Sequence, residues 1–289
     1  MKYKFIKERR KEFGFNFLID LLEVSGSGYY KYVKENQSNR QRENMILRKE
    51  IKKIFDEHKS RYGVRRITKE LRKRGYRYNR KRVTRIMQKE GLQVVQKQKY
   101  RATTNSCGNR NIFPNLLSKK SKASYPGEIL VSDITYIPTE EGWLYLAAVM
   151  DLLTRKILGY SMSSRINSQL VHNACKSASR GIQKPGVFHS DRGSQYGSSE
   201  VIDFCKNFRM KQSMSRKGNP YDNAAMESFF HTLKVELVNR KKYKTRDQAR
   251  QDIFEYIEIY YNKKRMHSAI DYLTPYEAEM KYLINNNVV

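Results

Sequence analysis

The sequence predicts an α/β fold in which a mixed five-stranded sheet, flanked by helices, follows an all-helical region. Three observations support this prediction. Apolar residues recur at helical spacing through the first third of the chain. From residue 128 onward, runs rich in β-branched and aromatic residues alternate with helical segments. The basic residues are concentrated in the helical part, so the two parts differ in chemical character.

The charge of the chain indicates a polyanionic partner. The 289 residues include 58 Lys and Arg against 29 Asp and Glu, a formal net charge of +29. Residues 1–125 hold 35 of these basic and 11 of these acidic residues, whereas residues 126–289 hold 23 and 18. Because a strong positive field attracts polyanions, we expect residues 1–125 to bind nucleic acid. The nearly balanced second part suits an enzyme core.

Several classes of protein are excluded. The three cysteines, Cys107, Cys175 and Cys205, are an odd number without CxxC spacing, which argues against a disulfide framework and against a zinc site. No apolar run approaches 18 residues, so we expect no membrane-spanning helix. The basic N-terminal segment has no small-residue cleavage site and does not predict a signal peptide. A reducing, cytoplasmic location fits these features.

The first domain is expected to span residues 1–95 and to be helical. Two short helices are predicted within residues 16–35, and Gly26 and Gly28 should break the chain between them. A third helix is predicted over residues 42–58, where apolar residues form most of a helical stripe.

Residues 64–90 predict a helix-turn-helix. The first helix should end before Gly75, and Asn79 should cap the second helix. A helix, a short turn and a very basic second helix are typical of DNA-reading domains. The alternative is a solvated charged face on a small helical bundle. The candidate DNA-binding residues on the outer face of the second helix are Arg80, Lys81, Arg82, Arg85 and Lys89.

A basic linker is predicted over residues 96–124, and a second domain over residues 125–289. The linker is polar, rich in Lys and Arg, and without sustained periodicity, so it could lie along a phosphate backbone. In the second domain, strands are predicted at 128–138, twice within 142–163, at 186–191 and at 210–215, and helices at 168–181, 199–208, 222–238 and 246–262.

Three carboxylates in the second domain are candidates for phosphodiester chemistry. Such chemistry needs an attacking oxygen and neutralisation of developing charge, which hard cations held by carboxylates provide. Asp133 lies within an apolar strand, where an acid is costly unless it binds something. Asp191 ends a short strand, and Glu227 lies on a helix. Taken singly, the first two could be turn or strand residues and the third a solvated helical Glu.

Four segments of the second domain resemble the integrase-type catalytic core of OrfB-type insertion-sequence transposases, relatives of retroviral integrases. They are WLYLAAVMDLLTRKILGYSM, HSDRGSQY, SRKGNPYDNAAMESFFHTLKVE and YNKKRMHSAIDYLTP. The segment HKSRYGVRRITKELRKRGYRYNRKRV resembles the helical DNA-binding region of the same proteins. The resemblance implies a ribonuclease-H-like fold with an acidic metal-binding triad whose last two members are separated by 35 residues.

Carried onto this chain, the triad is Asp133, Asp191 and Glu227, as both catalytic residues and metal ligands. The resemblance implies two Mg²⁺ ions, with Mn²⁺ as a possible substitute. It also implies hydrolytic nicking at the ends of the element, followed by strand transfer by the freed 3′-hydroxyl.

Further residues near the triad are assigned provisional roles. Lys234 follows Glu227 by seven residues, two helical turns, and is expected on the same face to position phosphates. Gln195 and Tyr196 could contact DNA on the turn after Asp191. Arg265 matches a motif of the family and could contact a phosphate, or it could pack against Tyr260 or Tyr261.

Other polar residues remain open to two interpretations. His189 could orient a metal ligand or a phosphate, or be a buried, satisfied histidine, and the role of His267 is not determined. Glu236 is expected to point away from the triad, and Asp222 should cap the helix of Glu227. Asn219 and Pro220 belong to the loop before that helix.

The sequence therefore predicts a DNA transposase that binds terminal inverted repeats and performs metal-dependent 3′-end cleavage and strand transfer on them and on target DNA. A homo-oligomer on DNA in the bacterial nucleoid is expected, with a possible upstream-frame partner or frameshift fusion. The alternatives are a DNA-binding regulator with an inactive core and a ribonuclease-H-like nuclease acting on RNA–DNA hybrids. The intact set of carboxylates disfavours the first, and the basic helical region disfavours the second.

Overall fold

The computed structural model describes residues 1–34, 39–94, 111–117, 123–182, 184, 186–216 and 223–287. The chain divides into two compact units, Met1–Val94 and Val95–Val289, which are described separately. Most of the predicted linker, together with Cys107, lies outside the described residues. Within the described ranges, no helix has both the length and the apolar character needed to cross a bilayer.

The first unit begins with three short helices, α1 (Lys2–Phe13), α2 (Phe15–Leu21) and α3 (Gly26–Lys34). They pack around Ile6, Leu18 and Tyr29. Helix α1 was not predicted from the sequence. The prediction that Gly26 and Gly28 break the chain between two helices is also wrong, because Gly26 begins α3 and Gly28 lies within it. A Cβ at Gly28 would lie 2.2 Å from the Tyr3 hydroxyl, so this glycine permits close approach of α1 rather than forming a turn.

The predicted helix-turn-helix elements are present in the same unit. They are α5 (Val64–Lys73) and α6 (Arg80–Lys89), which follow α4 (Asn39–Glu57). Gly75 has a φ of +89°, a conformation that glycine adopts without strain at the end of a helix. The Asn79 side chain accepts a hydrogen bond of 2.9 Å from the backbone N–H of Lys81, as expected of a helix cap. The fully buried apolar residues of α4–α6 include Leu47, Ile51, Ile54, Ile67, Leu71 and Val83.

The second unit contains a five-stranded sheet in the order β3-β2-β1-β4-β5. The first three strands pair antiparallel, and β4 and β5 run parallel to β1. The strands are β1 (Ile129–Thr139), β2 (Gly142–Asp151), β3 (Ile157–Ser163), β4 (Val187–Ser190) and β5 (Lys211–Met214). This is the predicted mixed sheet, with boundaries close to those expected.

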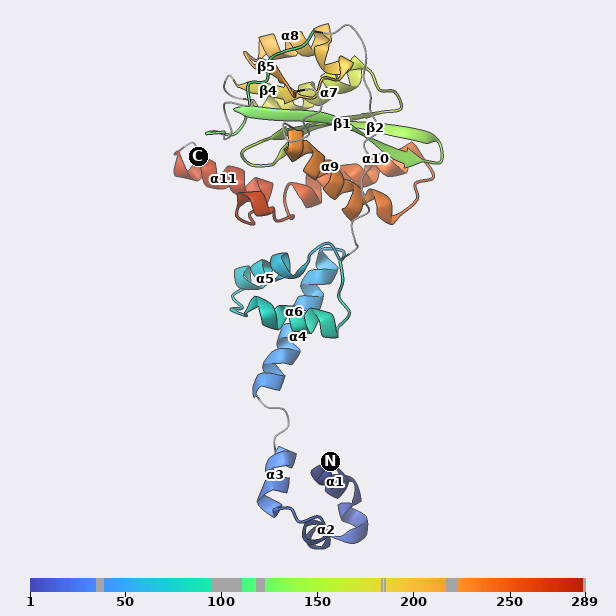
Figure 1. Ribbon diagram of the computed structural model, residues 1–289, viewed down its shortest axis with the longest axis vertical. Helices are drawn as coiled ribbons and strands as arrows, with labels where there is room; N and C mark the ends of the chain where they lie inside the picture. The colour runs from blue at the N-terminus through green and yellow to red at the C-terminus, as the bar shows by residue number, and fades with distance from the viewer. Residues whose placement is uncertain are drawn as a thin grey trace. The chain divides into compact units, whose positions relative to one another are not determined.

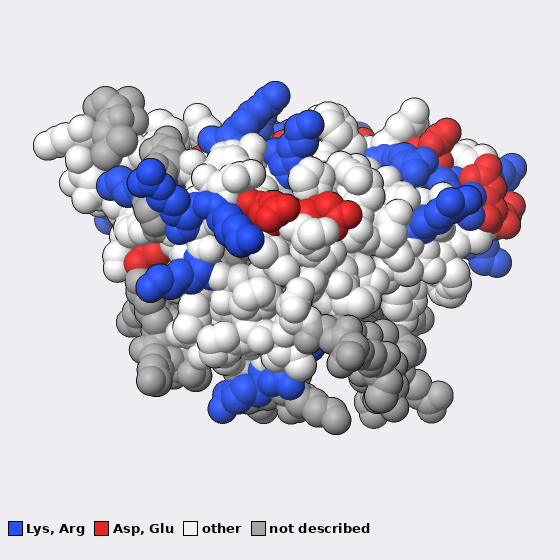
Figure 2. Space-filling model, turned by 90° about the horizontal axis from the view of Figure 1, so that it is seen from above, with Lys and Arg blue, Asp and Glu red and all other residues white. Residues whose placement is uncertain are grey.

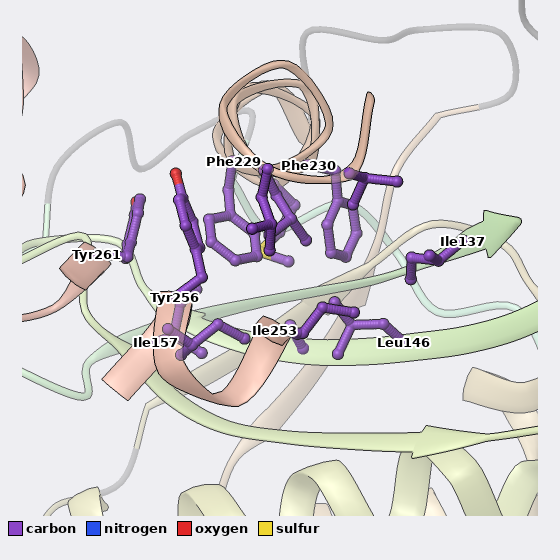
Figure 3. Packing of buried hydrophobic residues seen from close by; sticks show 14 of the residues in the cluster. Ile137, Leu146, Ile157, Phe229, Phe230, Ile253, Tyr256 and Tyr261 are labelled. Atoms are coloured by element: carbon purple, nitrogen blue, oxygen red, sulfur yellow. The ribbon is translucent and has the colours of Figure 1, made fainter. Parts of the chain in front are cut away.

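Helices cover both faces of the sheet, as Figure 1 shows. On one face, α7 (Ser168–Ala178) and α8 (Ser199–Asn207) contribute to an apolar cluster with Leu130 and Phe188. On the other face, α9 (Ala224–Glu236) and α10 (Arg246–Phe254) enclose a second cluster. In Figure 3, Phe229 and Phe230 point from α9 toward Leu146 of the sheet.

The C-terminal part departs from the prediction in two places. The helix predicted over residues 246–262 is α10 followed by a π-helix, Glu255–Tyr261. A further helix, α11 (Pro275–Asn285), was not predicted, although Thr274 and Glu277 form a capping box with proline at the first helical position. Among the described residues, the short 3₁₀ helices are η1 (Ser179–Gly181), η2 (Ser194–Gly197), η4 (Val238–Arg240) and η6 (Ser268–Ile270).

Candidate active site

Asp133 lies on β1, and Asp191 directly follows β4, the parallel strand beside it. The last register pair is Val131 of β1 with His189 of β4, so continuing the register by two residues brings Asp133 level with Asp191. Side chains alternate between the faces of a strand, and Val131 belongs to the cluster beneath α9. Asp133 therefore faces α9, the helix that carries Glu227 in its first turn.

The three carboxylates are close enough for their charges to interact. The pKa of Asp133 is raised to about 8, chiefly by burial and then by the negative charge of Asp191, with a smaller contribution from Glu227. The positive charge of Lys234 opposes this increase. Burial also raises the pKa of Glu227, although this side chain and that of Asp191 are exposed. Negative charge is therefore concentrated around Asp133.

The two aspartates also bond the backbone beside them. Asp133 Oδ1 accepts a hydrogen bond of 2.8 Å from the N–H of Ile134, and Asp191 Oδ1 accepts one of 2.8 Å from the N–H of Gly193. Across the part of the chain that the structure describes, no three His, Cys, Asp or Glu side chains are already arranged as a metal-binding group. The structure thus places the triad residues on neighbouring elements without closing a ligand cage.

Ser132 and Asn223, two polar residues that were not singled out from the sequence, link β1 to η2 and to α9. Ser132, fully buried, bonds Tyr196 of η2 through its hydroxyl, with 3.0 Å between the oxygens. Its carbonyl accepts a hydrogen bond of 3.3 Å from Nδ2 of Asn223, the residue before α9. The signal for Ser132 was a polar residue on the buried face of an otherwise apolar strand.

His189 is fully buried, which confirms the alternative of a satisfied histidine. Its Nδ1 lies 2.8 Å from the hydroxyl oxygen of Ser213, and its Nε2 lies 3.1 Å from that of Ser215. Arg192 donates a hydrogen bond of 2.8 Å to the carbonyl of Ser215. These contacts join β4 to β5 on either side of Asp191.

Lys234 shares α9 with Glu227, and its charge acts on Asp133. Its ammonium nitrogen lies 4.4 Å from the centroid of the Tyr136 ring, a cation–π contact. Burial lowers the pKa of Lys234, and the electrostatic interactions with Tyr136 and Asp133 oppose that shift. Gln195 lies half-buried in η2, but the expected DNA contact of Tyr196 is wrong in this structure, because Tyr196 is buried in the apolar core. Asn219, Pro220 and Asp222 lie outside the described residues.

The proposed phosphate contact of Arg265 is wrong in this structure. Arg265 is only 4% exposed, and its guanidinium is paired with Glu236. A buried, paired guanidinium cannot reach a phosphate without breaking that ion pair. Glu236 does point away from the triad, as predicted. His267 accepts a hydrogen bond of 3.3 Å from the N–H of Ala269 and caps a 3₁₀ turn.

The basic face of α6 is mostly free to meet DNA. Arg80, Lys81, Arg85 and Lys89 are exposed. Arg82 differs because its side chain is half-buried and bonds Glu43 and Asn44 of α4, at 2.9 Å in each case. Arg82 therefore acts first within the helical unit.

Figure 2 shows that one face of the molecule carries a small acidic patch near its middle, with Lys and Arg side chains around it.

Comparison with known families defines the class of the protein. Two family models described as integrase core domain match residues 123–220 and 208–275, and one described as HTH-like domain matches residues 41–100. Together with the sheet order, these matches define a protein with a ribonuclease-H-like integrase core and a helix-turn-helix-like region.

Full-length relatives narrow the identification. The chain is 46% identical over 244 residues to the transposase for insertion sequence element IS904 of Lactococcus lactis, covering 84% of this chain and 96% of that protein. It is 37% identical over 287 residues to transposase InsF for insertion sequence IS3A of Escherichia coli, covering 98% and 100%. The chain belongs to the IS3 family of insertion-sequence transposases. A solved HTLV-2 integrase catalytic core in complex with magnesium matches 55% of this chain and 99% of its own, at 16% identity and a TM-score of 0.43.

Proposed function

We propose that Asp133, Asp191 and Glu227 are the catalytic carboxylates of this transposase and that they act in 3′-end cleavage and strand transfer at terminal inverted repeats. One observation carries the proposal: the parallel register brings the two aspartates level on the face that α9 covers. The charges of Asp191 and Glu227 both act on Asp133, as expected of residues that share one site.

The donor chemistry of this site fits Mg²⁺. The three side chains supply only carboxylate oxygens, which hard cations prefer. The pKa of Asp133 is raised chiefly by burial and then by the negative charges of Asp191 and Glu227, which Lys234 opposes, so a bound cation would stabilise the ionised carboxylates there. Two Mg²⁺ ions would supply Lewis acidity, making the attacking hydroxyl more acidic and neutralising the leaving oxygen. Asp133, Asp191 and Glu227 would hold them.

The remaining residues bind and orient DNA in this proposal. Lys234 would contact a terminal or scissile phosphate, because its position on α9 places its charge beside Asp133. The exposed residues Arg80, Lys81, Arg85 and Lys89 would contact phosphates of the terminal repeats. Gln195 is retained as a candidate contact beside Asp191.

The test is a cleavage map on DNA carrying the element's own ends, with Mg²⁺ or Mn²⁺ present or absent. Asp133→Asn, Asp191→Asn and Glu227→Gln should each abolish cleavage and strand transfer while leaving binding of the ends intact. Asp203→Asn, an exposed aspartate on α8, is the matched control and should retain activity. Full strand transfer by Asp133→Asn would disprove the assignment. Binding without cutting by the unmodified chain, also in the presence of the upstream-frame product, would instead indicate a regulator.

We further propose that the chain acts as a homo-oligomer on DNA at the nucleoid in the cytoplasm, with an upstream-frame product, separate or fused to it, as a candidate partner in pairing the ends. A paired-end assay with and without the upstream product tests this. Efficient pairing by this chain alone would remove the need for a partner.

A further inference from the structure

Ser132 is bonded to three different elements of the catalytic unit. Its hydroxyl donates a hydrogen bond of 2.9 Å to the carbonyl of Ala148 on β2. The same hydroxyl oxygen lies 3.0 Å from the hydroxyl of Tyr196 on η2. The Ser132 carbonyl accepts a hydrogen bond from Nδ2 of Asn223, the residue directly before α9. Ser132 itself is fully buried, so these bonds are shielded from water.

The direction of these bonds follows from proton counting. A serine hydroxyl has one proton, and the Ala148 carbonyl can only accept, so that proton is used there. Tyr196 therefore donates to Ser132. The Tyr196 phenol keeps its proton, because burial and the nearby charges of Asp133 and Asp191 raise its pKa well above the ordinary value. Tyr196 thus donates to the Ser132 hydroxyl, and the Ser132 hydroxyl donates to the Ala148 carbonyl.

Each bond of Ser132 connects it to a segment that carries one candidate ligand. Asp133 is the next residue on β1. Tyr196 lies five residues after Asp191 and anchors the turn that follows it. Asn223 lies four residues before Glu227, one turn of helix away. The side chains of Ser132 and Asp133 point to opposite faces of the sheet, so Ser132 can act on the site only through the backbone.

We propose that Ser132 is the positioning residue of the catalytic site, fixing the backbone separations from which Asp133, Asp191 and Glu227 reach the metal ions. The proposal rests on the proposed ligand assignment. It assigns to Tyr196 the task of holding the turn of Asp191 against β1. Supporting residues of this kind commonly affect metal affinity even though they do not touch the ion.

The test uses Ser132→Ala and Tyr196→Phe in the full chain, with Mn²⁺ alone as the probe, titrated by the loss of its free paramagnetic signal. Each variant should weaken Mn²⁺ binding about tenfold. The double variant should match Ser132→Ala, because both changes remove the same Tyr196 bond. In strand transfer, the half-saturating Mg²⁺ concentration should rise about tenfold, with little change in the rate at saturating Mg²⁺.

Tyr256→Phe is the matched control, since it also removes a buried tyrosine hydroxyl, one that donates to Glu236 over 2.9 Å. It should lower thermal stability without changing Mn²⁺ binding. If Ser132→Ala fails to fold, Tyr196→Phe alone decides. Wild-type Mn²⁺ binding by Tyr196→Phe would overturn the proposal.

Glu227→Gln separates the two levels of inference. Loss of Mn²⁺ binding in Glu227→Gln, together with normal binding in Tyr196→Phe, would overturn the positioning role and leave the ligand assignment standing. Normal binding in Glu227→Gln would overturn the ligand assignment, and with it the positioning role.

Discussion

Arg265 and Glu236 form a buried, bidentate ion pair at the end of the helix that carries Glu227. Arg265 Nη2 lies 2.8 Å from Oε1 of Glu236, and its Nε lies 3.1 and 3.0 Å from the two carboxylate oxygens. Tyr256 donates a further hydrogen bond to the same carboxylate. Burial alone would lower the pKa of Arg265, but the charge of Glu236 raises it above its ordinary value. The pair therefore fastens the C-terminal end of α9 to the segment after the π-helix.

Replacing Arg265 should destabilise the core unit without altering DNA contacts. Arg265→Met leaves the Glu236 carboxylate buried and uncompensated, which we expect to lower the free energy of unfolding by about 3–5 kcal/mol. The chain has one tryptophan, Trp143 on β2, so its fluorescence during urea unfolding reports this unit. The double variant Arg265→Met/Glu236→Leu should recover much of the loss, since no unpaired charge remains. A lower salt dependence of DNA binding in Arg265→Met, with unchanged stability, would contradict this prediction and support a phosphate contact of Arg265.

Two of the arginines of α6, Arg82 and Arg85, should behave differently when replaced. Arg85 is exposed, so Arg85→Ala should weaken binding to terminal-repeat DNA and reduce the slope of log K against log salt by about 0.9 if one phosphate contact is lost. Arg82 is held by Glu43 and Asn44, so Arg82→Ala should chiefly destabilise the helical unit. Equilibrium binding at several salt concentrations, beside thermal unfolding, distinguishes these effects. Equal changes in salt slope for the two variants would show that Arg82 leaves Glu43 to bind DNA.

The sequence predicted the sheet and its strands well because each strand is a local pattern of apolar residues. The convergence of Asp133 and Asp191 was an inference from resemblance, and the β1–β4 register supplies its geometric basis. The partner of Arg265 could not be predicted, because Glu236 lies 29 residues earlier in the chain and meets it only through folding. Helix α11 was a different case, since Thr274, Pro275 and Glu277 formed a readable local signal that was overlooked.

Replacing Lys234 should weaken the binding of terminal DNA more than the binding of metal ions. A hydrogen bond to a charged group contributes about 1.5–3 kcal/mol, so Lys234→Met should raise the concentration of terminal DNA needed for half-maximal strand transfer at least about tenfold. Lys234→Arg should retain part of the function because it keeps the charge. Lys206→Met, an exposed lysine of α8, is the control and should leave the reaction unchanged. If Lys206→Met raised the required DNA concentration equally, the effect of Lys234 would come from the overall positive charge of the protein and not from a specific phosphate contact.

His58 makes the helical unit sensitive to mildly acidic pH. Its ring is only 8% exposed and stacks on Tyr62, with 3.6 Å between the ring centroids. Burial lowers its pKa from 6.5 to about 4, and the charges of Glu70 and Glu57 only partly oppose the shift. His58 is the one histidine in the sequence of residues 1–94.

The free energy of unfolding of the helical unit should fall as the pH falls from 6.5 to about 4, by up to about 3 kcal/mol. In that window the unfolded chain binds a proton on His58 and the folded chain does not, so acid favours unfolding. Hydrogen exchange of peptides from residues 39–94 measures this in the full chain, where Trp143 would report only the other unit. His58→Phe keeps an aromatic ring against Tyr62 and should flatten the dependence above pH 4.5. Below that pH the carboxylate of Glu57, whose pKa its bond to Arg74 lowers, adds its own loss. An unchanged pH dependence in His58→Phe would show that another group controls it.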